Sequence, residues 1–167
     1  MPGTPISRRR PLLNALAFAM SLTALQSAAM AASPFEKFIG SWSGSGQIVG
    51  ANGHHESIRC RAEYTEAKAG SGLNQTIVCA SESFKLDIQS YVEAAGESIQ
   101  GYWKEAARDV SGHVTGRILG GSFEGEFSAP TFTAAISLTS NGRTQSVSIQ
   151  PRGGDISAVR IELARRG

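Results

Sequence analysis

Residues 131–150 read Thr-Phe-Thr-Ala-Ala-Ile-Ser-Leu-Thr-Ser-Asn-Gly-Arg-Thr-Gln-Ser-Val-Ser-Ile-Gln, and this stretch decides the fold. Up to Thr139 most apolar residues alternate with hydroxyl residues, which is the period of a β-strand with one buried face. Asn141-Gly142 is a residue pair typical of a tight hairpin turn. The stretch therefore predicts an antiparallel hairpin, and alternation broken by glycine turns recurs through most of the chain.

The same pattern predicts ten strands after residue 40. Their ranges are 41–49, 56–66, 73–81, 84–92, 98–105, 113–118, 122–128, 131–139, 143–150 and 156–164. No predicted connection is long enough for a Greek-key crossover, so successive strands should be neighbours. Closing such a meander into an all-β, up-and-down antiparallel barrel removes its exposed edges. Before the first strand, Ser33-Pro34-Phe35-Glu36 has the pattern of a capping box, which predicts one short helical turn.

Glycines and aromatic residues bear on the kind of barrel. Several glycines occupy positions that face the barrel interior. There they would either let the strands coil tightly or merely loosen the strands. They are Gly44, Gly46, Gly101, Gly116 and Gly125. An outer-membrane barrel also alternates, but it needs longer loops at one end, aromatic girdles and strands of about 9 to 11 residues. With 7% aromatic residues and short loops, we expect a barrel whose apolar face points inward.

Residues 1–31 have the pattern of a cleaved export signal. Three arginines at positions 8–10 precede an apolar segment, and Ala29-Met30-Ala31 supplies small residues before the expected cut. We therefore expect a single domain over residues 32–167 in the periplasm or outside the cell, exported by the general secretory or the twin-arginine route. The signal holds 3 of the 16 basic and none of the 14 acidic residues, so the mature net charge is about −1. This balance gives no electrostatic case for a nucleic-acid partner or an anionic membrane.

The two cysteines, Cys60 and Cys79, are in phase with apolar neighbours on two successive predicted strands. In an oxidising compartment the simplest outcome is one disulfide across those strands. A reactive thiol pair is the alternative, but the chain lacks a Cys-x-x-Cys spacing.

Residues 38–46, Phe-Ile-Gly-Ser-Trp-Ser-Gly-Ser-Gly, resemble the Gly-x-Trp opening strand of the calycin superfamily, which includes lipocalins, fatty-acid-binding proteins and nitrobindin-like barrels. The resemblance implies that Trp42 closes one barrel end beneath an arginine from near the chain's end, either Arg160 or Arg165. Nitrobindin-like barrels bind haem through a late histidine, whereas the last histidine here is His113. We therefore expect no haem and no other cofactor. The mature chain, with Arg59-Cys60-Arg61, also resembles exported alphaproteobacterial proteins, which implies only a compartment.

No residue set forms a catalytic or metal motif. His54-His55-Glu56 lies at a turn where neighbouring side chains point to opposite faces; Asp109, Ser111 and His113 match hydrolytic chemistry by residue type alone. Glu124 and Glu126 share an expected outer face, and Tyr102 and Trp103 fit packing better than recognition. We expect neither a catalytic nor a metal site.

Two functions remain open for a non-enzymatic barrel. The first is a carrier or sensor for a small apolar or amphipathic ligand, whose interior site would be lined by Phe84, Ile88, Trp103, Phe132 and Ile136. The second is an envelope interaction module, such as an inhibitor or assembly factor, with an interior filled by aromatic side chains and a protein partner at its surface. An empty interior of more than about 300 Å³ would favour the first.

Overall fold

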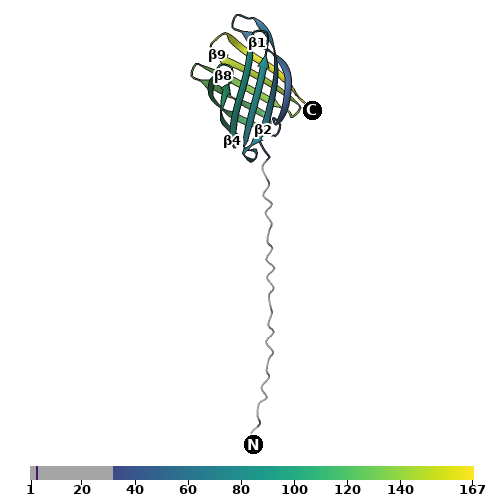
Figure 1. Ribbon diagram of the computed structural model, residues 1–167. Coiled ribbons are helices and arrows are strands. Elements are labelled where there is room, and N and C mark those ends of the chain that lie inside the picture. Colours follow the sequence, from purple (N-terminus) through teal and green to yellow (C-terminus); the bar gives the residue numbers. More distant parts are fainter. Residues whose placement is uncertain (1–2, 4–31) are drawn as a thin grey trace. The chain divides into compact units, whose positions relative to one another are not determined.

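The computed structural model describes residue 3 and residues 32–167, and the latter contain ten antiparallel strands closed into a barrel (Figure 1). The strands are β1 (Gly40–Gly50), β2 (His55–Ala67), β3 (Gly72–Ala80), β4 (Lys85–Ala95), β5 (Ser98–Glu105), β6 (Val110–Leu119), β7 (Ser122–Ala129), β8 (Phe132–Ser140), β9 (Thr144–Arg152) and β10 (Ile156–Arg165). Each strand pairs with the next, and β10 pairs with β1. The predicted up-and-down barrel is therefore confirmed. The expected signal peptide lies outside the described residues except for Gly3, so it stays a prediction.

Turn chemistry explains where the strands begin and end. In the turn between β8 and β9, the Asn141 side-chain oxygen accepts bonds from the amides of Arg143 and Thr144, and Gly142 has a φ of 86°. The largest errors in the sequence-based boundaries are three residues each: β4 ends at Ala95 instead of Val92, and β6 begins at Val110 instead of His113. Asp109, with a φ of 53°, ends the preceding turn early enough for Val110 to pair with Glu105.

The single helical turn expected before the first strand is a run of consecutive turns. In residues 34–38 the Phe35 carbonyl accepts from the amides of Phe38 and Ile39. The Ser33 hydroxyl accepts from the amide of Phe35, as a cap does, and itself donates to the carbonyl of Gly70. A short 3₁₀ turn, Lys68–Gly70, joins β2 to β3. Among the described residues, no helix combines the length and apolar character needed to cross a membrane.

The strands alternate between an apolar interior and a polar exterior. On β2 the buried positions are Ile58, Cys60, Ala62 and Tyr64, and the intervening positions are exposed, among them Arg59 and Arg61. A barrel that faces lipid carries an outward apolar band instead. The apolar face of β2 therefore points inward, as the sequence predicted.

Glycine permits close contact between strands at the positions that the sequence indicated. A Cβ added to Gly44 would lie 1.9 Å from the carbonyl oxygen of Glu162 on β10. Gly116 and Gly125 are paired on β6 and β7, and the ring of Phe123 covers both. These glycines thus allow tight coiling, so the alternative that they only loosen the strands does not hold here.

The chain segment before β1 plugs one end of the barrel, called here the closed end. Phe35, Phe38 and Trp42 are buried there, and the Trp42 indole donates to the carbonyl of Phe38 at 2.7 Å. The guanidinium of Arg165 lies 4.9 Å from the Trp42 ring centroid. Arg160, the other arginine considered, is exposed in mid-strand on β10. The opposite end, where β5 ends and β6 begins, has no such plug in the described residues and is called the open end.

Candidate functional site

An apolar cavity occupies the barrel on the side of the open end, and its volume is about 310 Å³. All ten strands contribute to its wall, β3 through Cys79, β7 through Phe127, and β8 through Phe132 and Ala134. We call this space the outer chamber. Its volume lies at the lower limit of the range usual for small-molecule sites.

A second cavity of about 100 Å³, the inner chamber, lies between the outer chamber and the closed end. Phe35 and Phe38 of the N-terminal plug line its floor. The two chambers share lining residues, namely Cys79, Leu86, Ile88, Phe127, Ile149 and Ile161. They therefore adjoin, so a ligand in one chamber would lie next to the other.

Strand register assembles three polar side chains at the inner chamber. Tyr64 on β2 pairs with Gln75 on β3, and Gln75 pairs with Ser90 on β4. All three line the chamber, and the Ser90 hydroxyl lies 3.0 Å from the Gln75 side-chain oxygen, to which it can donate. We call these residues the polar row. Sequence reasoning missed it, although each residue is a polar side chain in the inward phase of its strand, which is the signal that could have revealed it.

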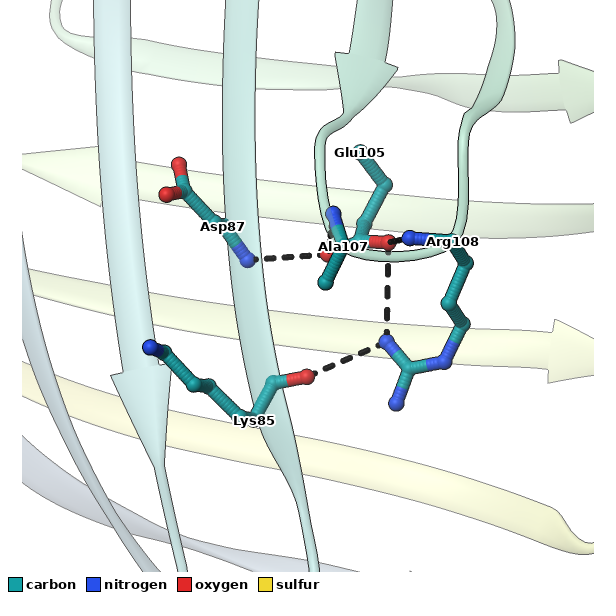
Figure 2. Close-up of polar contacts among 5 residues, drawn as sticks. All are labelled: Lys85, Asp87, Glu105, Ala107 and Arg108. Atoms are coloured by element: carbon teal, nitrogen blue, oxygen red, sulfur yellow. Dashed lines mark hydrogen bonds and ion pairs between the residues drawn. The ribbon is translucent and has the colours of Figure 1, made fainter.

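The buried carboxylate of Glu105 stands at the wall of the outer chamber, and Figure 2 shows its polar contacts. The Glu105 side chain is only 4% exposed. Its oxygens accept from the backbone amides of Asp87 at 3.1 Å, Ala107 at 3.2 Å and Arg108 at 2.7 Å. The carboxylate therefore ties the turn after β5 to β4 at the open end.

Arg108 completes this arrangement from the same turn. Its guanidinium lies 3.6 Å from the Glu105 carboxylate and donates to the carbonyl of Lys85 at 3.0 Å (Figure 2). The guanidinium also covers the Phe84 ring, with 4.7 Å to the ring centroid. Burial by itself raises the pKa of Glu105, but the three amides and Arg108 outweigh it and leave the pKa lowered. Glu105 is thus ionised and compensated near neutral pH, which suits a structural clamp better than a proton donor.

The five residues proposed as ligand-lining divide between the chambers. Phe84, Trp103 and Phe132 line the outer chamber, Ile136 lines the inner one, and Ile88 lines both. Trp103 is buried and packs against Phe132, with 5.7 Å between ring centroids, while Phe132 is 37% exposed at the open end. Whether these residues bind a ligand stays a prediction.

The disulfide prediction is confirmed. Cys60 and Cys79 face each other on β2 and β3 with Cα atoms 4.1 Å apart and form a disulfide. Both cysteines line the inner chamber, so the bond forms part of its wall.

The weaker candidate residues do not converge into a site. The Glu56 carboxylate accepts from the Ser83 amide and hydroxyl at a turn. Asp109 pairs with Lys104 at 2.9 Å, and His113 lies on β6 opposite Tyr102. On β7, Glu126 lies 3.5 Å from Arg152. Over residue 3 and residues 32–167, no cluster of three or more His, Cys, Asp or Glu side chains has the geometry to hold a metal ion.

Several solved structures resemble this barrel, two of them as follows. The crystal structure of Rv2717c from M. tuberculosis has a TM-score of 0.65 and 15% sequence identity, covering 80% of this chain and 95% of that chain. The S-type phycobiliprotein lyase CPES from Guillardia theta has a TM-score of 0.54 and 12% identity, covering 80% of this chain and 90% of that chain. No protein-family model and no curated protein matches the sequence. At these identities the likeness shows the fold alone.

Proposed function

We propose that this protein is a non-enzymatic barrel that binds a small apolar or amphipathic molecule in its interior. The observation that carries the proposal is the outer chamber, about 310 Å³ of space inside a barrel whose opposite end is plugged. An apolar pocket of this size with one open end is the usual form of a small-molecule site. A barrel stabilised only by packing has no need to leave such a space, because unfilled volume costs stability.

The composition of the wall supports binding in preference to catalysis. Glu105 and Arg108 are the charged residues of the outer chamber's lining, and both are already engaged with each other and with backbone groups. A reaction needs a nucleophile, acid or base within reach of the substrate and free to exchange a proton. Because Glu105 and Arg108 are engaged with each other, the apolar part of the wall is the surface that would hold the molecule.

The compartment belongs to the same proposal. A disulfide in the barrel wall fits an oxidising environment, and the first 31 residues have the pattern of an export signal. The molecule that binds would accordingly be one present in the periplasm or outside the cell.

Uptake of a fluorescent apolar probe tests the proposal. N-phenylnaphthylamine should brighten on binding to the wild-type protein. Ile88→Phe fills space at the junction of the two chambers, so it should weaken probe binding at least several-fold while changing stability by only about 1 to 3 kcal/mol. Gln89→Phe, at an exposed position on the same strand, is the matched control and should leave uptake unchanged.

The competing function is an interaction module that acts through its outer surface. It predicts no probe uptake by the wild-type protein, no co-purifying small molecule, and recovery of a stoichiometric partner protein from the periplasm. That combination of results would replace the ligand-binding proposal.

A further inference from the structure

From the polar row we infer that the ligand carries a neutral hydrogen-bonding group, such as a hydroxyl, carbonyl or amide, which lies in the inner chamber while the ligand's apolar part fills the outer chamber. The inference rests on the proposed function and specifies the class of ligand. Three arguments carry it: the placement of the row, its spare hydrogen-bonding capacity and the distribution of charge along the cavity.

The row is the polar part of an otherwise apolar wall. Besides Tyr64, Gln75 and Ser90, the inner chamber is lined by aliphatic, aromatic and cysteine side chains. Polar side chains are costly to bury without partners, so their appearance together on three neighbouring strands requires an explanation. A group that hydrogen-bonds to them from within the chamber supplies one.

The row has more hydrogen-bonding capacity than it uses internally. The bond from Ser90 to Gln75 engages one lone pair of the Gln75 oxygen and does not involve the N–H donors of the Gln75 amide. The Tyr64 side chain is 3% exposed. Burial raises the pKa of its hydroxyl, and no other group contributes to that shift. The row can therefore both donate to and accept from a ligand.

Charge along the cavity argues for a neutral group. The inner chamber is lined by no Asp, Glu, Lys, Arg or His within the described residues, and an ion placed there would lose its hydration without a counter-charge. The charged pair Glu105 and Arg108 lies instead at the outer chamber. An anionic headgroup would thus favour the open end near Arg108, whereas a neutral polar group can enter the inner chamber.

The depth of the row sets the size of the ligand. Ser90 lies five residues from Lys85, the first residue of β4 at the open end, which corresponds to about 16 Å along the strand. A molecule that contacts the row and also fills the outer chamber is therefore elongated, with its polar group at or near one end.

Competition against bound N-phenylnaphthylamine tests the inference with decanol, chlorodecane and decanoate, which share an alkyl chain and differ in the terminal group. The measured quantity is the ratio of the inhibition constants of decanol and chlorodecane, compared between wild type and variants. Gln75→Leu should shift this ratio against decanol by about tenfold, the size of one lost hydrogen bond. Thr76→Leu, an exposed neighbour on β3, should leave the ratio unchanged.

Tyr64→Phe removes a single hydroxyl and keeps the ring, so it provides a second variant should Gln75→Leu fold poorly. A several-fold shift of the ratio in the same direction is expected. If the ratio is the same in wild type, Gln75→Leu and Tyr64→Phe while the probe still binds, the inference is wrong and the row is a structural feature.

Decanoate distinguishes the remaining possibility. If decanoate competes better than decanol and loses its advantage in Arg108→Gln, the polar group is anionic and lies at the open end, which also overturns the inference. If the wild-type protein takes up no probe, the proposed function fails and the inference fails with it. The two failures are therefore distinguished by probe uptake alone.

Discussion

The closed and open ends of this barrel are built from similar residues but are packed in opposite ways. At the closed end, Trp42 is completely buried between the N-terminal plug and Arg165. At the open end, Phe132 is 37% exposed and Trp103 borders a cavity of about 310 Å³. The difference shows that an aromatic residue in the inward phase of a strand stabilises the fold at one end and lines a space at the other.

The largest expected effect separates the two ends by stability. Trp42→Ala should lower the free energy of unfolding by about 3 to 5 kcal/mol, because it leaves a cavity in a fully packed region. Phe132→Ala should cost no more than about 1.5 kcal/mol, since its ring is partly in solvent already. Urea denaturation of both variants measures the difference. Equal losses would show that the ends are packed alike.

The disulfide between β2 and β3 should contribute almost as much as Trp42. Replacing both cysteines by alanine should cost about 3 kcal/mol by the chain-entropy estimate, because the bond closes a loop between residues 19 apart. Denaturation with and without reductant should give the same difference in the wild type. Titration of denatured, unreduced protein should detect no free thiol, and two free thiols would contradict the structure.

Glu105 provides a test that is specific to the open end. Glu105→Gln should lower stability by about 1 to 3 kcal/mol at neutral pH, because buried amide donors lose their carboxylate acceptor. The folded-state pKa is lowered from 4.5, so the carboxylate stabilises the fold above pH 4.5, and this contribution is lost as the pH falls through the folded-state pKa. The gap between wild type and variant should therefore close in acid. A gap independent of pH would mean that the carboxylate is not the group responsible.

The smallest effect on stability is expected for Arg108. Its side chain is 47% exposed, so Arg108→Gln should cost no more than about 1 kcal/mol through its ion pair and its contact with the Phe84 ring. Because Arg108 lines the outer chamber, the same change should nevertheless alter the rate at which N-phenylnaphthylamine enters. Stopped-flow fluorescence measures that rate, and Lys104→Gln in the neighbouring exposed pair with Asp109 is the control.

Much of the barrel could be predicted because alternation is a local property. Residues 131–150 contain both the period of two and the Asn-Gly turn, and the structure forms the expected hairpin there. Local reasoning could not show which distant segments meet. Ser33 has the residue type of a helix cap, and its hydroxyl accepts from the Phe35 amide, but the same hydroxyl also donates to the carbonyl of Gly70, 37 residues away.

The candidate site could be predicted only in part. Phase along each strand identified the inward aromatic and aliphatic residues, including Ile88 and Ile136, but not the chamber that each would line. The role of Glu105 was not visible, because its partners include the amide of Asp87 on a different strand. Of the two arginines considered for Trp42, Arg165 lies over the ring. The register between β1 and β10, which places Arg165 opposite Trp42, determines this.

The sequence by itself determined the strands, their order and their inward faces, because a period of two and glycine turns are set by neighbouring residues. Only the tertiary structure decided that the interior is plugged at one end and hollow at the other, since empty volume depends on barrel radius and on the summed size of side chains from all strands. It also decided that Tyr64, Gln75 and Ser90 meet. Cross-strand register brings them together, and register is a relation between strands that no single stretch of sequence contains.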